Sequence, residues 1–345
     1  MSNRSCHEIE IDGAPVYFVD DINSDEGESD PEMLIVQGRM FPADANVAIS
    51  LPQDSAELQR CLNHHRVFKM VLRSNYWGPV EQVLAPIPGQ LERKRVLDMV
   101  TAEGSWVQEM AQQFPHVDFL SVDNVPLTAH IPRPNIEFEV YDLFNGIVAP
   151  DESFDMIHIR QSTAHIRNPT ELIRELYRVL KPGGLLLFVD SQLDIFDAKD
   201  PKYPARAKYP GLDRGLQIVR TSLAQQGVNP YLWRDLPRLL GPQSEIWRNG
   251  PEMNRGKRQV GFRTIRTKAH IFPVAEWPRD TYKKAMGRLA GDTLKGMWRS
   301  MEVPFQMYGM DPEVANGIIQ GAIGDLERPG TKPSFKTHTI FAFKV

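Results

Sequence analysis

The chain has 345 residues, of which 41% are hydrophobic, enough for one large domain or a core domain with an appended lid. Its 40 basic and 44 acidic residues give a net charge of −4, which argues against a dedicated nucleic-acid-binding domain. Two cysteines, Cys6 and Cys61, are too few for a disulfide framework or a cysteine-rich metal site, so we expect no metal. The longest apolar run, residues 185–189, is far shorter than the roughly 20 residues that span a bilayer. We expect a soluble cytoplasmic protein without membrane contact, with the nucleus as the alternative.

The first part of the chain is predicted to lie outside the main domain. Residues 20–30 carry six acids and no base, which is typical of a solvated flexible segment, although an acidic partner-binding motif is the alternative. An approximate helical stripe of apolar residues then runs through residues 55–84. We therefore predict a peripheral, partly disordered segment at 1–50 and an N-terminal helical lid at 51–92.

From residue 95 the pattern changes to alternating strands and helices. Continuously apolar strands are predicted at 96–100, 117–123, 136–142, 154–160 and 185–190, as in a parallel sheet covered on both faces. A helix is predicted at 169–180, because Asn168 can cap it, Pro169 suits its first turn and Glu171 completes a capping box. The sequence Lys-Pro-Gly-Gly at 181–184 should end this helix and turn into the next strand.

The last third of the chain completes the same domain. We predict a loop at 194–212, helices at 215–226 and 281–301, and two late strands at 262–272 and 336–345. Two such strands after a parallel sheet usually form an antiparallel addition at one edge. The main domain is therefore predicted at 93–345, with a C-terminal helical insertion near 281–325.

Three acids follow three of the predicted strands. Asp98, Asp123 and Asp142 each end a strand, and ligands of doubly wound α/β domains bind across the carboxyl ends of the strands. Asp123 comes about 20 residues after the first turn, where a carboxylate can accept both ribose hydroxyls. Asp142 is placed for an adenine amino group. The alternative is that these acids only cap helices and turns, but three in register favour a nucleotide-type cofactor.

At this point the chain resembles the class I S-adenosylmethionine-dependent methyltransferases, and among them those of fungal secondary metabolism, including the methyltransferase-like regulators. The resemblance rests on VLDMVTAEGSW, VDNVP, FEVYD, SFDMIHIR and ELIRELYRVLKPGGLLLFVD, which begin at residues 96, 122, 138, 153 and 171. Weaker support comes from LPQD at 51–54 and PVAEWP at 273–278. The resemblance covers roughly residues 50–345.

The resemblance implies an α/β fold: a Rossmann-like seven-stranded sheet with an antiparallel last strand, helices on both faces, and N- and C-terminal lid elements. It also implies S-adenosylmethionine as the cofactor. By position, Asp98, Thr101 and Gly104 would lie at the methionine end of the cofactor, and Asp123 and Asn124 at the ribose. Asp142 and Leu143 would flank the adenine, and Arg160 and Gln161 would face the cofactor and the acceptor.

The implied reaction is in-line transfer of a methyl group from a sulfonium, for which the protein mainly supplies proximity and alignment. A general base is needed only when the acceptor is a hydroxyl or an ammonium group. The candidates are His165, which follows the fourth strand, and His158, which lies within that strand and is more typical of a packed residue. We therefore take His165 as the candidate catalytic residue.

The turn that should approach the cofactor departs from the family pattern D-x-G-x-G-x-G. Val100 and Ala102 replace the first two glycines, and Gly104 is retained. A β-branched residue at positive φ stores about 1–3 kcal/mol of strain, or one to two decades of affinity if the bound state carries all of it. Alternatively, the backbone at Val100 is extended and the pocket is reshaped. Three interpretations stay open: an active enzyme, a fold member that acts as a regulator or scaffold with a protein partner, and a member recruited to other chemistry.

Aromatic and methionine side chains indicate the kind of acceptor. Trp298, Met301, Phe305, Met307 and Tyr308 lie at the end of the helix predicted at 281–301 and just after it, and Tyr76 and Trp77 precede the sheet. If several of these residues line a pocket rather than pack in the core, the acceptor is a small apolar, aromatic or polyketide-like molecule. A basic stretch at 248–270 reads as a solvated strand edge. Metal hydrolase, serine hydrolase and kinase motifs do not occur in the sequence, and a dehydrogenase would need the missing glycines to hold a pyrophosphate.

Overall fold

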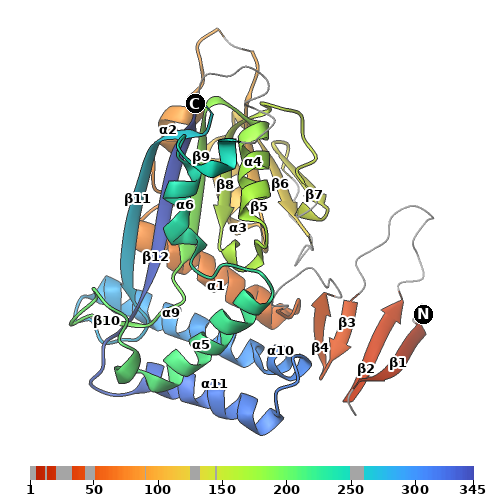
Figure 1. Ribbon diagram of the computed structural model, residues 1–345, viewed down its shortest axis with the longest axis vertical. Helices are drawn as coiled ribbons and strands as arrows, with labels where there is room; N and C mark the ends of the chain where they lie inside the picture. Colours follow the sequence, from red (N-terminus) through yellow and green to blue (C-terminus); the bar gives the residue numbers. More distant parts are fainter. Residues whose placement is uncertain are drawn as a thin grey trace.

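The computed structural model describes residues 5–11, 14–20, 33–42, 51–89, 91–124, 133–143, 146–248 and 260–345. A central sheet carries helices on both faces, a group of helices lies beyond one end of its strands, and a small separate sheet is formed by the N-terminal residues (Figure 1). In these residues, no helix is long and apolar enough to cross a membrane.

The central sheet has the strand order β10-β12-β9-β8-β5-β6-β7, and β11 also pairs with β12. Strands β5 to β9 are parallel, whereas β12 is antiparallel to both β9 and β11. This is the predicted Rossmann-like sheet with an antiparallel late strand, extended by the two-residue strand β10. Its strands are β5 (Lys94–Met99), β6 (Val117–Asp123), β7 (Ile136–Val140), β8 (Phe154–Arg160), β9 (Leu180–Ser191), β10 (Phe196–Asp197), β11 (Phe262–Pro273) and β12 (Pro333–Lys344).

Both faces of the sheet are buried, which explains the continuous apolar runs. On β9, Leu185 and Leu187 pack with Trp106 of α3, whereas Leu186 and Phe188 pack on the opposite face with Ile173 of α4. The helices that cover these faces include α2 (Val80–Leu84), α3 (Ser105–Gln113), α4 (Pro169–Val179), α6 (Leu232–Leu240) and α7 (Glu245–Arg248).

A second core lies beyond the carboxyl ends of the strands, where Figure 1 shows α5, α9 and α11 side by side. Trp298 is its centre, and the α5 backbone approaches so closely at Gly215 that a Cβ there would lie 2.6 Å from the indole. Phe305 and Met301 are buried in the same core, so these three aromatic and methionine residues pack rather than line an open pocket. The helices around this end of the sheet are α1 (Ser55–Leu72), α5 (Pro210–Gln225), α9 (Thr281–Ser300), α10 (Glu302–Met307), α11 (Pro312–Glu327) and the 3-10 turns η2 (Thr163–His165) and η3 (Arg206–Lys208).

The N-terminal residues form a four-stranded antiparallel sheet that the sequence pattern did not reveal. Its strands are β1 (Ser5–Ile11), β2 (Ala14–Asp20), β3 (Met33–Val36) and β4 (Arg39–Pro42). Phe41 is fully buried against Val303 of α10, and Arg39 forms an ion pair with Asp54, the N-cap of α1. Of the acidic segment 20–30 only Asp20 lies in the described residues, and residues 249–259 of the basic stretch at 248–270 lie outside them.

Several predicted boundaries move. The helix predicted at 215–226 begins at Pro210, inside the predicted loop 194–212, and β7 ends at Val140, two residues before Asp142. The helical region 55–84 is two helices, because Arg73 adopts a left-handed conformation with φ 57° and ends α1. The Lys-Pro-Gly-Gly sequence is not a separate turn: β9 already begins at Leu180, and the sequence forms a bulge between two paired parts of the strand. Gly183 at φ 74° supplies the left-handed residue that the bulge needs.

Candidate functional site

The turn after β5 keeps a left-handed backbone despite its missing glycines. Val100, Ala102 and Gly104 have φ values of 60°, 48° and 72°. The Val100 amide donates to the Val122 carbonyl at 2.9 Å, and the Ala102 amide donates to Asp123 Oδ2 at 2.7 Å. These bonds to β6 hold the turn, so Val100 has not relaxed to an extended conformation. The folded chain therefore carries the strain of two non-glycine residues in the left-handed region, about 1–2 kcal/mol each.

The Asp98 carboxylate is hydrogen-bonded to other side chains of the protein. His158 Nδ1 donates to its Oδ1 at 2.8 Å, and the Ser121 hydroxyl lies 3.3 Å from its Oδ2. The His158 ring is stacked on Trp106 at a centroid distance of 3.6 Å, and burial lowers its pKa. His158 is therefore a neutral, packed residue that positions the strand-end acid, as its place within a strand indicated.

Asp123 and Asn124 lie together at the end of β6, facing the first turn on one side and the end of β7 on the other. Asp123 holds the turn through the Ala102 amide, and its own carbonyl accepts from the Tyr141 amide at 3.2 Å. Asn124 Oδ1 accepts from the amide of Leu143, whose side chain is buried, at 3.5 Å. The predicted ribose and adenine residues are thus neighbours, and Asp142 lies between Tyr141 and Leu143 in the same segment.

The residues that follow β8 join the sheet to α1. Arg160 Nη1 donates to His65 Nδ1 at 3.1 Å, and the guanidinium lies 5.5 Å from the centroid of the Phe68 ring. Burial, with a smaller contribution from Arg160, lowers the pKa of His65 to about 4. Gln161 has a positive φ of 56°, and its Nε2 donates to Ser191 Oγ at 3.0 Å. The two residues therefore point their polar groups toward different neighbours, α1 for Arg160 and β9 for Gln161.

His165 lies in η2, in the loop after β8. Its Nδ1 is buried without a hydrogen-bond partner, and burial lowers its pKa, so the imidazole is neutral near pH 7. Its backbone amide donates to the carbonyl of Ser162, whose hydroxyl is also buried and unpartnered. A neutral histidine with a polar atom unused by the protein can take a proton or a hydrogen bond from a ligand.

Comparison with known proteins points to the same family that the sequence motifs resemble. Residues 73–234 match a family described as a methyltransferase domain. Similar curated proteins include methyltransferase str3 of Strobilurus tenacellus, which is 28% identical over 62% of this chain and 74% of its own length. These matches support the resemblance of the chain to the class I S-adenosylmethionine-dependent methyltransferases of fungal secondary metabolism.

Another similar curated protein is named as a regulator and not as a methyltransferase. The secondary metabolism regulator LAE1 of Cochliobolus heterostrophus is 29% identical over 69% of each chain. Among solved structures, the Haemonchus contortus phosphoethanolamine N-methyltransferase 2 in complex with S-adenosyl-L-methionine has 13% identity and a TM-score of 0.43, and covers 98% of this chain and 71% of its own. The chain thus resembles curated proteins of both kinds, methyltransferases and regulators.

The residues at the carboxyl end of the sheet fit a polar cofactor. Buried polar atoms of proteins normally have hydrogen-bond partners. At this end, the described residues contain several buried side-chain atoms without one: Thr101 Oγ1, Glu103 Oε1, Asn124 Nδ2, Ser162 Oγ and His165 Nδ1. Three of them lie in or beside the turn and the end of β6, where the cofactor is expected. Their unused hydrogen-bonding capacity is what an amino acid, ribose and adenine group would take up.

Three residues of this region were not predicted as site residues from the sequence. Glu103 lies within the turn itself, and a charged residue in a turn that approaches a ligand was the available signal. Arg60 and His65 lie on α1, more than 30 residues before the turn, and only the packing of α1 against the end of β8 brings them there. Helical periodicity marks a buried face but does not say which strand that face meets.

Proposed function

We propose that this protein transfers a methyl group from S-adenosylmethionine to a small-molecule acceptor of the secondary-metabolite type. The observation that carries the proposal is the left-handed turn after β5, held by Asp123 and surrounded by buried polar atoms that have no protein partner. The bound cofactor supplies an activated methyl group on a sulfonium. The protein supplies alignment, exclusion of water and, for a hydroxyl or ammonium acceptor, a base.

We assign the roles by position along the strand ends. Asp98, Thr101 and Gly104 would contact the methionine end of the cofactor, and Asp98 would also keep the strand end in place through His158. Asp123 and Asn124 would take the ribose. We expect Asp142 and Leu143 to hold the adenine, and Arg160 and Gln161 to lie between the cofactor and the acceptor.

The residues near the proposed acceptor position favour an aromatic substrate. His338 is stacked on Trp233 at 3.7 Å and an interplanar angle of 11°, and its Nε2 donates to Gln192 Oε1 at 3.1 Å. In the sheet, His338 pairs with Asp190, which lies at the end of β9 beside the Gln161 side chain. A flat aromatic surface at this strand end suits the packing of a planar acceptor. We propose that the neutral His165 accepts the acceptor proton.

The alternative is a methyltransferase-fold regulator that binds a protein partner and has weak or no transfer activity. Val100 and Ala102 favour it, because their side chains stand where the family pattern has glycines that let the backbone approach the ligand. A curated relative named as a secondary metabolism regulator is consistent with this alternative. We place either form of the protein in the cytoplasm, with the nucleus as the alternative, and fluorescence microscopy of a tagged chain tests that location.

Calorimetric titration of the full chain with S-adenosylmethionine and S-adenosylhomocysteine tests the proposal. We expect both to bind, and a panel of aromatic and polyketide-like acceptors with radiolabelled methyl donor to yield a methylated product. Absence of binding at millimolar ligand would refute the methyltransferase proposal. Binding without turnover of any acceptor would favour the regulator.

A further inference from the structure

A cleft of about 250 Å³ lies at the carboxyl end of the edge strand β11, near the lower end of that strand in Figure 1. The end of α1, the first turns of α9 and the segment after β10 form its other walls. Pockets for drug-sized ligands measure about 300–1,000 Å³, so this cleft suits a smaller molecule. Strands β5, β8, β9 and β12 lie between β11 and β6, which places these two strands roughly 24 Å apart at the usual strand spacing. The cleft is therefore separate from the proposed cofactor site.

The walls of the cleft carry apolar and aromatic side chains, among them Trp277, Tyr282 and Ile271. Ile271 is 45% exposed and Tyr282 is 40% exposed. The polar atoms of both rings already have partners, because Trp277 Nε1 donates to the Pro333 carbonyl at 3.0 Å and the Tyr282 hydroxyl donates to the Met70 carbonyl at 2.9 Å. These bonds hold the rings in place, so that their flat apolar surfaces are available to a planar ligand.

The charged side chains that line the cleft are both basic. They are Arg73 at the end of α1 and Lys283 in the first turn of α9, and among the described residues no acid lines the cleft. The Arg73 guanidinium lies 5.3 Å from the centroid of the Tyr282 ring, and neither base forms an ion pair with a described residue. Asp280, the acid closest to Lys283 in the sequence, caps α9 by accepting from the Lys283 backbone amide at 2.8 Å. The cleft thus combines an apolar wall with two cations that no described acid neutralises.

A neighbouring cavity of about 370 Å³ has the opposite arrangement, although Trp277 lines both cavities. The charged side chains of this larger cavity are in ion pairs. Arg288 is paired with Glu276 at 2.7 Å, and Lys295 is paired with Asp292 at 2.9 Å. Of these two adjacent cavities, the smaller one therefore has cations available to an anionic ligand.

We propose that the smaller cleft binds a small aromatic carboxylate, whose ring lies against Trp277 and Tyr282 and whose carboxylate is held by Arg73 and Lys283. Guanidinium and ammonium groups both bind carboxylates through charge-assisted hydrogen bonds. Flat rings pack favourably on aromatic side chains. The site shares no residue with the proposed cofactor and acceptor positions, so it is a second small-molecule site and goes beyond the proposed function.

Ligand-observed NMR titration of the full chain with a matched set of naphthalene probes tests the charge. 2-Naphthoate carries the carboxylate, 2-naphthamide is its neutral counterpart, and 2-naphthylmethylammonium has the opposite charge. We expect 2-naphthoate to bind about tenfold more tightly than the other two, because a hydrogen bond between charged groups contributes about that much affinity. Equal affinities for these probes, or no binding of 2-naphthoate at about 5 mM, would overturn the inference.

Substitutions of exposed side chains locate the bound carboxylate. Lys283→Gln and Arg73→Gln should each weaken 2-naphthoate binding about tenfold and leave 2-naphthamide within about twofold of wild type. Lys284→Gln is the matched control, because Lys284 is the next residue of α9, does not line the cleft and pairs with Glu276 at 3.9 Å. Thermal melting confirms that each variant is folded. The inference fails if Lys283→Gln weakens 2-naphthoate no more than Lys284→Gln does.

Two further titrations define the ligand class and the location. Octanoate places the same carboxylate on a flexible aliphatic chain and should bind more weakly than 2-naphthoate; equal affinity would refute an aromatic site. Saturating S-adenosylhomocysteine should leave 2-naphthoate affinity unchanged, and competition between the two would place the probe in the transfer centre and overturn the inference. Failure of the proposed function is distinguishable, because a chain that does not bind S-adenosylhomocysteine should still bind 2-naphthoate.

Discussion

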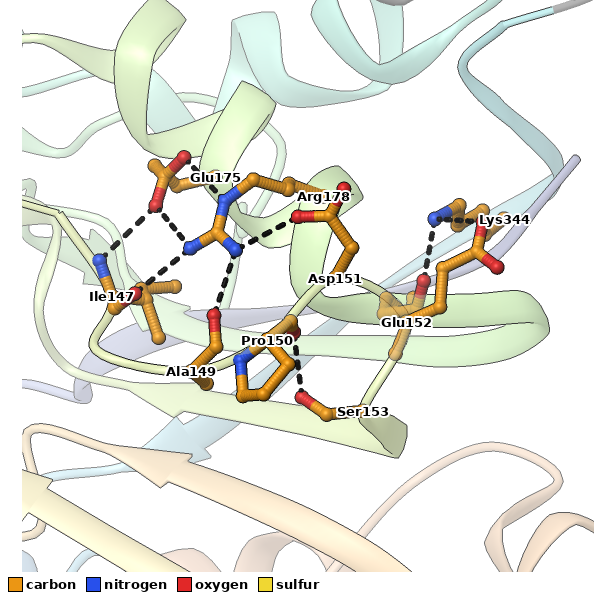
Figure 2. A network of polar contacts seen from close by, with 10 residues as sticks. Ile147, Ala149, Pro150, Asp151, Glu152, Ser153, Glu175, Arg178 and Lys344 are labelled. Carbon is orange, nitrogen blue, oxygen red and sulfur yellow. Dashed lines mark hydrogen bonds and ion pairs between the residues drawn. The ribbon is translucent and has the colours of Figure 1, made fainter.

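The two ends of the central sheet differ in whether their buried polar groups have hydrogen-bond partners within the protein. At the amino end, Arg178 donates to both oxygens of Glu175, to Asp151 and to the carbonyls of Ile147 and Ala149, as Figure 2 shows. At the carboxyl end, polar atoms of the turn, of Asn124 and of the loop after β8 are buried without partners. Buried polar groups that the protein satisfies hold the fold together, and those that it leaves unsatisfied indicate where a ligand completes the structure.

The contrast also holds for single carboxylates. At the amino end, Asp155 is bound by Lys94 at 2.9 Å, by the Arg95 amide at 3.0 Å and by Lys181 at 3.0 Å, and these contacts lower its pKa despite burial. At the carboxyl end, Glu103 has arginines nearby but no ion pair, and burial raises its pKa. The amino end is thus arranged for stability, and the carboxyl end is the one where we propose that the cofactor binds.

Acid should affect the two ends in separate pH windows, with the largest effect at the carboxyl half. Burial lowers the pKa of His65, His270 and His338 to about 4, compared with about 6.5 in an unfolded chain. The unfolded chain therefore binds more protons, and stability should fall as pH drops from about 6.5 toward 4. Each histidine contributes at most about 1.4 kcal/mol per pH unit, and less where solvent screens it.

Asp155 has the same sign in a lower pH window. Its lowered pKa makes its contribution fully present above the unfolded value of about 3.9, so that it is lost only as pH falls below that value. Denaturant unfolding followed from pH 7.5 to pH 3.5 checks both windows. A stability that is flat between pH 6.5 and 4.5 would contradict the assignment of the buried neutral histidines.

Strand β6 allows the two ends to be compared within one element. Asp123→Ala should weaken S-adenosylhomocysteine binding about a hundredfold, because it removes the expected ribose contacts and the bond that holds the Ala102 amide. Asp118→Ala, at the other end of β6, removes only a half-exposed ion pair with Arg93 and should leave affinity unchanged. Calorimetry measures the affinity of both variants for S-adenosylhomocysteine. If the two affinities are equal, Asp123 does not contribute to binding.

At the amino end we expect lost stability with intact binding. Arg178→Ala should lower the free energy of unfolding by about 2–3 kcal/mol, because it leaves Glu175 and two loop carbonyls without their donor. Arg178→Lys should recover only part of this loss, since an ammonium group cannot reach all of these acceptors at once. Urea unfolding measures the change, and a parallel loss of S-adenosylhomocysteine affinity would show that the two ends are not separate.

The smallest expected effect tests the strain in the turn. Val100→Ala and Val100→Gly remove the same two methyl groups, but only glycine relieves the left-handed conformation. We expect the glycine variant to be more stable than the alanine variant by about 1 kcal/mol, the reverse of their order at an ordinary position. If alanine is the more stable of the two in urea unfolding, Val100 is not strained.

Much of the domain could be predicted because its signals are local. The Asn168 cap, the Pro169 first turn and the Glu171 amide bond recur in the structure of α4, and strands β6 and β8 have their predicted ends. The N-terminal sheet was missed because it lies in a segment whose composition resembles disorder, and the bulge of β9 because its register depends on β8.

The candidate site was likewise predictable only in part. The strand-end residues Asp98, Asp123 and Arg160 were predictable, since the ends of parallel strands meet at one edge of the sheet. The partners of these residues were not. His158 reaches Asp98 across the strand pair β5–β8, and His65 reaches Arg160 from α1.

By itself, the sequence determined the class of fold, the end of the sheet where a ligand is expected and the departure at Val100 and Ala102, because periodicity, caps and strand-end acids act over a few residues. Only the tertiary structure decided that the turn keeps its left-handed backbone, that Asp98 is held by His158, and that Arg160 meets His65 of α1. These outcomes depend on contacts between residues far apart in the chain. Their geometry exists only after the helices have packed on the sheet.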